Sequence, residues 1–268
     1  MCKFFSLLSN GNGKTYYLNA KDRKEVRGPD LYPDSHSSIV EFYKRKGKLA
    51  LKPDTEDKLN KYEYNPITGK FRIDQINTRD DSKSVERQCR KLDFKTIIPE
   101  LVIKPIFHPF SDRNRKRVTG NDIQRLREWV SLRDSMWDSL MCSVWESVRS
   151  SVRESLRETL REDVRDSVRN PLRESLSESA GKYVGGSVRD SVHAYISSFF
   201  ILEEWKHVEH EKGINPFQPG IELWESGLVP SFDGKTWRLH GGSGNVVFEI
   251  SKEELMKQFR NTKDEVKK

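Results

Sequence analysis

Short runs in which apolar and polar residues alternate dominate the first half of the chain. Two aromatic-rich runs flank Asn10-Gly11-Asn12-Gly13, a turn sequence that strongly favours a β-hairpin. Residues 62–76 repeat this pattern around a turn from Asn65-Pro66 to Gly69. The sequence therefore predicts two hairpins in its first eighty residues.

Other segments of the first half have different patterns. Residues 34–48 predict a short helix capped by Asp34 or Ser35, and a second helix is expected to begin at about Ser82. Residues 96–107 predict a strand punctuated by prolines. Because strands and helices do not alternate regularly, the expected fold class is α+β.

The last part of the chain repeats this style on a small scale. Residues 221–230 predict a helix that ends at Gly227, and residues 231–251 predict a hairpin or meander. The turn signals of that meander are Asp233-Gly234 and the stretch from Gly241 to Asn245. A closing helix is expected over residues 252–261.

Between these parts the chain divides into seventeen consecutive tetrads, from Ser131 to Ser198. The commonest form is Ser, an aliphatic residue, Arg and an acid, as in residues 151–154 and 187–190. The second place of the tetrad is apolar in every copy. This regularity is the strongest signal in the sequence.

A period of four fits a strand poorly. Alternation along a strand would place valine and carboxylate on one face, and such a face cannot pack a dry core. A tight β-solenoid whose corners accommodate the carboxylates stays open as the alternative.

A helix explains the tetrads better. Four residues turn a helix by about 400°, so each apolar place lies about 40° ahead of the last. The resulting stripe winds right-handed, which excludes a left-handed coiled coil. Acid-to-Arg pairs three residues apart, such as Glu154 with Arg157, stabilise the helix by about 0.2–0.5 kcal/mol each. We therefore expect one of three outcomes: the apolar stripe is partly exposed, the helix is broken into shorter segments, or a partner winds around it.

Breaks and ends of the array are visible. Asn170-Pro171 is typical of a helix start. The glycines Gly181, Gly185 and Gly186 are expected to end a segment, and Ser187 with Asp190 is expected to form a capping box that restarts it. The Arg place holds Trp137, Met141 and Trp145 at one end, and residues 194–205 are nearly all apolar at the other.

We therefore expect both ends to dock as buried core and residues 147–178 to form an exposed span. The predicted parts are a basic α+β domain over residues 1–120, a long, interrupted helical tetrad-repeat arm over residues 121–205, and a small β-hairpin-plus-helix domain over residues 206–268. The sequence leaves open whether the C-terminal domain packs on the N-terminal domain.

The composition is that of a polar chain with enough aromatic residues to form an ordered fold. Of the 268 residues, 34% are hydrophobic and 33% charged, and aromatic residues make up 10%. No apolar run approaches the roughly 18 residues of a membrane span, and no signal peptide is evident, so we expect a protein of the cytoplasm without a membrane partner. Cys2, Cys89 and Cys142 match no disulfide framework and no zinc spacing, which favours isolated reduced thiols.

The excess positive charge lies in the first half. Residues 1–130 hold 28 Lys and Arg against 18 Asp and Glu, whereas residues 131–198 and 199–268 have net charges of −1 and −2. Basic runs can neutralise phosphates, and the runs here include residues 43–48 and 113–117. Solvated loops are the simpler interpretation of such runs.

Candidate enzyme motifs are incomplete. The Gly-Lys-Thr sequences at residues 13–15 and 234–236 lack the earlier glycine of a phosphate loop and lie where hairpin turns are expected. His207 and His210 have no third ligand nearby, and Asp34-Ser35-His36 has the letters of a triad without its geometry. In some amidotransferases a glycine follows the amino-terminal nucleophilic cysteine, whereas Lys3 follows Cys2 here. We predict no catalytic residues, no metal site and no cofactor.

Taken together, these stretches resemble a tetrad-repeat family of proteins from bacteriophages of gut bacteria, including the crAss-like phages. The stretches that carry the resemblance are KFFSLLSNGNGKTYYLN, PDSHSSI, NKYEYNPITGKF, the SVRD-type tetrads, AYISSFF and LVPSFDGKTWRLH. The resemblance covers nearly the whole chain. It implies a phage setting, in the host cytoplasm or the virion, and implies neither an activity nor site residues.

The sequence thus predicts a non-enzymatic interaction or assembly protein that acts through the tetrad arm, with a protein partner or a second copy. The expected interaction stripe consists of Val152, Leu156, Leu160, Val164 and Val168. The alternative is a nucleic-acid or nucleotide binder, acting against host defence, whose expected phosphate contacts are Arg113, Arg115, Lys116 and Arg117.

Overall fold

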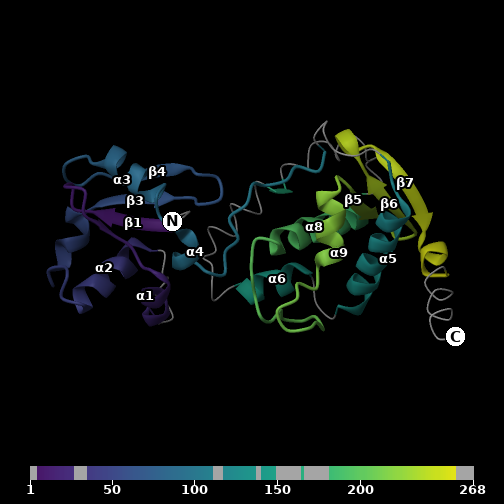
Figure 1. Cartoon of the computed structure of the whole chain (residues 1–268), viewed down its shortest axis with the longest axis horizontal. Helices are drawn as coiled ribbons and strands as arrows, with labels where there is room; N and C mark the ends of the chain where they lie inside the picture. The colour runs from purple at the N-terminus through teal and green to yellow at the C-terminus, as the bar shows by residue number, and fades with distance from the viewer. Residues whose placement is uncertain are drawn as a thin grey trace. The chain divides into compact units, whose positions relative to one another are not determined.

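The computed structural model describes residues 5–26, 35–110, 117–136, 140–148, 164–165 and 181–257. They form two compact units, an N-terminal unit that ends at Pro105 and a C-terminal unit that begins at Ile106. Each unit combines helices with one antiparallel sheet, so the expected α+β class is confirmed (Figure 1).

The N-terminal unit contains a four-stranded sheet of order β2-β1-β3-β4. Its strands are β1 (Phe5–Ser9), β2 (Thr15–Tyr16), β3 (Asn60–Tyr64) and β4 (Phe71–Gln75). Strands β1 and β2 form the first predicted hairpin and strands β3 and β4 form the second, so both predictions are confirmed. Strand β1 also pairs with β3, with Phe5 opposite Tyr64, which joins the two hairpins into one sheet.

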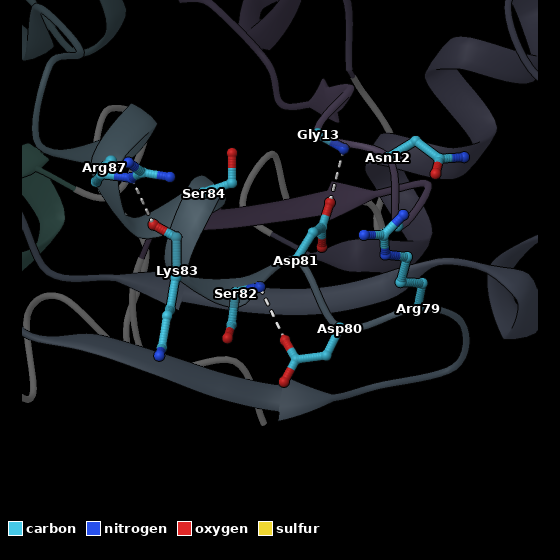
Figure 2. A pocket seen from close by; sticks show the side chains of 10 residues that line it. Asn12, Gly13, Arg79, Asp80, Asp81, Ser82, Lys83, Ser84 and Arg87 are labelled. Carbon is cyan, nitrogen blue, oxygen red and sulfur yellow. Dashed lines mark hydrogen bonds between the residues drawn. The ribbon is translucent and has the colours of Figure 1, made fainter.

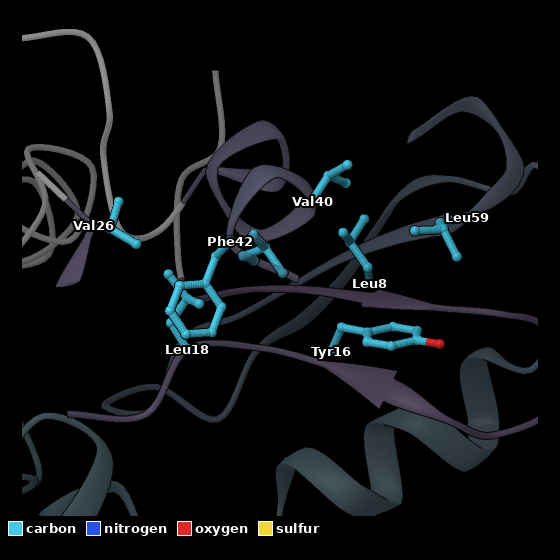
Figure 3. Packing of buried hydrophobic residues seen from close by; sticks show 8 residues of the cluster. Leu8, Tyr16, Leu18, Val26, Val40, Phe42 and Leu59 are labelled. Carbon is cyan, nitrogen blue, oxygen red and sulfur yellow. The ribbon is translucent and has the colours of Figure 1, made fainter. Parts of the chain in front are cut away.

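Helices cover both faces of this sheet. They are α1 (Ala20–Glu25), α2 (His36–Arg45), α3 (Ser82–Cys89) and α4 (Phe94–Ile97), with a 3-10 helix η1 (Pro53–Lys58). Helix α2 begins where predicted, because the Ser35 side chain accepts a hydrogen bond from Ser38 N at 3.1 Å. Figure 3 shows Val40 and Phe42 of α2 gathering with Leu8 of β1 between helix and strands.

The opposite face of the sheet packs on α3 and α4. Phe94 of α4 contacts Phe5 edge-on and stacks on Tyr64, with ring centroids 5.1 and 5.6 Å apart. Val85 and Cys89, from the buried side of α3, complete this layer. Helix α3 begins at the predicted Ser82.

The C-terminal unit packs helices against a three-stranded meander of order β5-β6-β7. Its elements are α5 (Gly120–Ser135), α6 (Leu140–Val148), α8 (Gly181–Ser197), α9 (Gln218–Glu225), β5 (Val229–Phe232), β6 (Thr236–His240), the 3-10 helix η3 (Gly242–Gly244) and β7 (Val246–Ser251). The meander is confirmed, and so is the end of α9 before Gly227, whose φ of 77° suits glycine. Residues 252–257 are helical as expected.

The described ends of the tetrad array form part of the core of this unit. Leu140, Val144 and Trp145 of α6 are buried, and so are almost all residues from Ser191 to Phe200. Tyr195 stacks on Trp224 of α9 at 5.1 Å with an interplanar angle of 9°. The prediction that both ends dock as buried core is therefore confirmed for these residues.

Helix α8 corrects the predicted break at its glycines. It runs without interruption through Gly185, Gly186 and Ser187, and Ser187 caps no new helix there. A glycine in a helix costs about 1 kcal/mol relative to alanine, and the packing of α8 on β5 and α9 outweighs that cost.

The predicted strand at residues 96–107 is also wrong. The segment begins in α4 and continues without regular structure, apart from a single bridge at Leu101. Asp93 caps α4 by accepting a hydrogen bond from Lys95 N at 3.1 Å, and Pro99 and Pro105 cannot donate to a ladder.

The boundary between the units differs from the one expected near residue 120. Helix α5 packs on α9, and the described residues from Ile106 onward belong to the C-terminal unit. The start of the predicted arm and the predicted C-terminal domain are therefore parts of one body.

Candidate functional site

Serines from the first place of the tetrads bind main-chain groups of β5. Ser187 Oγ accepts a hydrogen bond from Phe232 N at 2.8 Å. One tetrad further along α8, Ser191 Oγ lies 3.4 Å from Pro230 O and 3.1 Å from its own helix's Ser187 O. Because β5 is an edge strand of its sheet, these hydroxyls take the place of a further strand.

Helix α6 uses its tetrad serines in the same way. Ser143 Oγ donates a hydrogen bond to Lys206 O, and Ser147 Oγ accepts one from Lys206 N at 2.8 Å. Two serines four residues apart thus bind both main-chain groups of one residue. In both helices the small hydroxyl side chain lets a neighbouring segment approach closely.

The third and fourth places of the tetrads join helices to one another. Arg133 of α5 forms an ion pair with Asp190 of α8 at 2.6 Å, and its guanidinium lies 5.2 Å from the centre of the Trp237 ring. The two charged residues belong to the first and the fifteenth tetrads. At another third place, Trp145 of α6 meets His193 of α8 with ring centroids 5.4 Å apart.

Most of the predicted stripe lies outside the described residues, namely Val152, Leu156, Leu160 and Val168. Val164 is described: its backbone is helical and its side chain is fully buried. We expected this position to lie in an exposed span. The Val164 side chain is instead removed from water, which stabilises the folded chain.

The predicted phosphate contacts Arg113, Arg115 and Lys116 also lie outside the described residues. Arg117 is described and exposed, just before α5. The predicted cluster of four therefore stays a prediction, since only Arg117 lies within the described residues.

A hollow of about 560 Å³ lies in the N-terminal unit, between the β1–β2 turn and the start of α3. This α3 hollow is lined by Gly11, Asn12, Gly13, Arg79, Asp80, Asp81, Ser82, Lys83, Ser84 and Arg87. Figure 2 shows Asp81 directed at Gly13, with Arg79 and Asn12 to one side and Ser84 and Arg87 to the other. Three of the lining residues are basic, and none is aromatic.

Asp81 holds the walls of the α3 hollow together. One carboxylate oxygen accepts hydrogen bonds from Ser9 Oγ and from Gly13 N at 2.9 Å. The other accepts from Tyr62 Oη at 2.7 Å and from Asn60 Nδ2 at 3.1 Å. Burial by itself raises the pKa of Asp81, but these four donors outweigh it and hold the pKa below its usual value.

The turn at Gly11–Gly13 has the structure of a hairpin turn held by Asp81 and does not have that of a phosphate loop. A side chain on Gly11, whose φ is 76°, would lie 2.7 Å from Thr78 Cγ2 and 2.9 Å from Arg79 O. The N–H groups of Gly11 and Asn12 already donate to Ser9 Oγ and Asn10 Oδ1. The turn joins two strands and opens no helix, so the hairpin predicted here is confirmed.

The remaining candidates are structural. Ser35 caps α2, and His36 is buried with Nε2 3.1 Å from Tyr62 O, so these two form no triad. His207 pairs with Glu146 at 3.0 Å, and His210 Nε2 accepts from Trp205 N at 2.9 Å, so both ring systems serve protein contacts. Within the described ranges no group of three or more metal-ligating side chains occurs.

A serine–histidine pair in the C-terminal unit has the distances of a nucleophile and its base. Ser231 Oγ lies 2.7 Å from His240 Nε2, and His240 Nδ1 lies 2.9 Å from Gly244 O. Both side chains are fully buried, which leaves no access for a substrate. Burial lowers the pKa of His240, so the pair is a neutral, satisfied part of the core.

Comparisons with protein-family models, curated proteins and solved structures give no match to this chain. The resemblance to phage tetrad-repeat proteins therefore stays a prediction. No helix in the described part of the chain is both long and apolar enough to cross a membrane. Cys89 and Cys142 are free thiols.

Sequence reasoning missed the α3 hollow. Its residues come from the hairpin turn and from residues 79–87, which are far apart in the chain and share no motif. The available signal was Asp80-Asp81-Ser82 before a helix, since an acid or serine at this place favours a helix start. Nothing in that pattern predicts that Asp81 turns toward the Gly13 turn.

Proposed function

We propose that this chain is a non-enzymatic phage protein that acts as an interaction and assembly module through its tetrad array. The ion pair between Arg133 and Asp190 carries the proposal, because it joins tetrads 57 residues apart in the chain. Tetrads of this chain are thus complementary in charge to one another. A second copy of the chain offers the same complementary places.

Each place of the tetrad has a role that suits such contacts. The serine permits close approach and binds main-chain groups, as Ser143 and Ser187 do. The apolar place supplies the burial that drives association, at about 25 cal/mol per Å² removed from water. Arginine and acid select the neighbour and its register.

The sequence between α6 and α8 preserves these places. Its first places hold Ser151, Ser155, Thr159, Asp163, Ser167, Pro171, Ser175 and Ser179. Only Asp163 and Pro171 lack a hydroxyl. Of the predicted stripe, Val152, Leu156, Leu160 and Val168 make up the apolar surface that we propose for association, and Val164 is left out because it is buried within the chain.

Light scattering after size-exclusion chromatography tests the proposal. We expect the wild-type chain to form an oligomer, and the triple variant V152S/L156S/L160S to return toward the monomer. Val164 stays unchanged because it is already buried. A wild-type monomer over the full concentration range, or equal masses for both proteins, contradicts self-association.

Serine variants separate the hydroxyl from the apolar stripe. If Ser151 and Ser155 bind main-chain groups as Ser143 and Ser187 do, alanine at both places removes two hydrogen bonds worth about 1 kcal/mol each. The dissociation constant should then rise roughly 30-fold. Threonine at the same places keeps the hydroxyl and serves as the matched control. Unchanged association of the alanine variant assigns the contact to the apolar stripe alone.

Polyanion binding by the N-terminal unit is the second candidate. Residues 1–105 hold 22 Lys and Arg against 15 Asp and Glu, which equals the whole net charge of +7. Single-stranded DNA titrated at several salt concentrations measures this binding, and neutralisation of several phosphates predicts a steep fall with salt. A flat salt dependence, or no binding at low salt, rejects it.

A further inference from the structure

We propose that the α3 hollow binds a phosphoryl group, held by Arg79, Lys83 and Arg87. The inference deepens the second proposed function by naming the ligand group and the residues that bind it. It rests on four features of the described residues: the size of the hollow, the state of its basic side chains, the state of its acids and the absence of aromatic rings.

The hollow has the dimensions of a small-molecule site. Its volume of about 560 Å³ lies within the roughly 300–1,000 Å³ of ligand pockets. A phosphate or a nucleotide fills such a space. Side chains that reach it come from two segments that Asp81 fixes to each other, so the shape exists before any ligand arrives.

The three basic side chains are available for a ligand. Arg79, Lys83 and Arg87 are exposed, and among the described residues none of the three forms an ion pair. Lys83 and Arg87 stand four residues apart on α3, and Arg87 Nε donates to Lys83 O at 3.2 Å. An arginine guanidinium recognises phosphate with two parallel hydrogen bonds, and a lysine adds a point charge.

The two acids of the hollow are already engaged. Asp81 accepts four hydrogen bonds from its own unit. Asp80 accepts one from Ser82 N at 2.9 Å, and this bond lowers its pKa. Among the described residues neither acid forms an ion pair with a basic side chain of the hollow, although the nearby charge of Lys83 also lowers the pKa of Asp80. Asn12, Ser82 and Ser84 add uncharged polar groups.

The lining also indicates which part of a ligand is recognised. Nucleic-acid sites that read bases stack them on aromatic rings, and the α3 hollow has none. Recognition through the phosphoryl group therefore fits better than recognition through a base. The group can come from free phosphate or a nucleotide, or from the 5′ end of a nucleic acid.

Isothermal titration of the full chain with inorganic phosphate at low salt tests the site. We expect saturable binding that weakens at least tenfold in the double variant Lys83→Gln/Arg87→Gln. Lys95→Gln is the matched control, because Lys95 is exposed on α4 and does not line the hollow, and it should bind within twofold of wild type. No saturable binding, or equal loss in both variants, overturns the proposal.

Two oligonucleotides distinguish the sources of the phosphoryl group. A 5′-phosphorylated strand that binds at least tenfold tighter than the same strand with a 5′-hydroxyl identifies the end of a nucleic acid as the ligand. Equal binding of both strands, with phosphate binding intact, identifies a small phosphorylated molecule. If both strands bind and phosphate does not, polyanion binding stands and the α3 hollow is excluded as the site.

Discussion

Asp81 illustrates how one side chain decides a local structure. It precedes α3 as a helix cap would, yet its carboxylate caps no helix and instead joins β1, the glycine turn and β3. Four donors on one carboxylate are more than a single cap uses. The residue therefore holds together three segments that the sequence places up to 72 positions apart.

Substituting Asp81 should unfold the N-terminal unit selectively. Asp81→Asn turns an acceptor into a donor that faces Gly13 N or Asn60 Nδ2, and we expect a loss of about 2–4 kcal/mol in the free energy of unfolding. Urea unfolding followed by circular dichroism measures it. Because residues 1–105 contain no tryptophan, an unchanged tryptophan transition in the same samples confirms that the loss is local.

Asp80→Asn is the matched control for this measurement. Asp80 is exposed and its hydrogen bonds are to the neighbouring Ser82, so its loss should cost less than about 1 kcal/mol. Equal effects of the two substitutions would refute the role assigned to Asp81.

His240 makes the C-terminal unit sensitive to mild acid. Burial lowers the pKa of His240 below its ordinary value of 6.5, so the unfolded chain binds a proton more readily than the folded one. Stability therefore falls as the pH drops below about 6.5, by at most about 1.4 kcal/mol per pH unit for one group. Tryptophan-detected urea unfolding between pH 7.5 and 5.5 measures this slope.

His240→Gln should flatten that dependence while lowering stability at neutral pH. Asp190 acts in the opposite direction at lower pH, since burial raises its pKa despite Arg133. An unchanged slope in the variant would assign the pH response to another group.

At the scale of elements, α8 shows why a period of four serves a helix beside a strand. Four helical residues advance by about 6.0 Å, and two strand residues advance by about 6.4–6.8 Å. Ser187 and Ser191 therefore meet Phe232 and Pro230, which are two residues apart on β5. The 40° turn per tetrad limits such a match to a few rungs on a straight strand.

Alanine substitutions of glycines in α8 and in α9 are expected to change the stability of the unit in opposite directions. A Cβ on Gly185 or Gly186 meets no atom within 4 Å, so alanine at either position should stabilise the unit by about 0.5–1 kcal/mol. A Cβ on Gly220 would lie 2.8 Å from the Trp129 ring and 3.1 Å from Ala194 Cβ, so Gly220→Ala should cost about 1–3 kcal/mol.

Tryptophan-detected thermal unfolding measures these three variants under one set of conditions. The pair Gly220→Ala/Trp129→Phe provides the control, because the smaller ring should relieve part of the clash. Destabilisation by Gly185→Ala would contradict the continuous helix α8.

Local signals explain which elements were predictable. Turn residues such as Gly11 and Gly69, and the Ser35 cap, act through their immediate neighbours, so the two hairpins and α2 follow from the sequence. Helix α1 was missed although Asn19 and Asp22 form a capping box, because it is only six residues long. The continuity of α8 depends on packing with β5 and α9, which no local pattern contains.

At the scale of the whole molecule, the chain divides differently from its sequence pattern. The array was expected to separate two globular parts, and its described ends instead belong to one unit. Charge follows the observed division closely, with a net +7 in the N-terminal unit and a balance of acids and bases in the rest. The candidate site of the basic unit was not predictable, since its walls meet only in three dimensions.

Shortening the array should leave both units folded. Deleting residues 151–158 removes two tetrads between α6 and α8, and the entropy of closing a loop changes slowly with its length. We expect the tryptophan-detected unfolding midpoint to stay within about 2 °C of wild type. Deleting six residues, 151–156, is the control that disrupts the register, and it should weaken association more than deletion of a whole number of tetrads.

Because α5 and α8 hold the two ends of the array within one body, we expect the gene to tolerate a particular kind of change. Each tetrad is encoded by twelve nucleotides, so strand slippage during replication adds or removes whole tetrads without shifting the reading frame. In a continuous helix each added tetrad would turn the residues that follow it by about 40°, and we expect the packed ends of the array to keep their fold. Copy-number variation would then give related versions of one surface without a single substitution in the core.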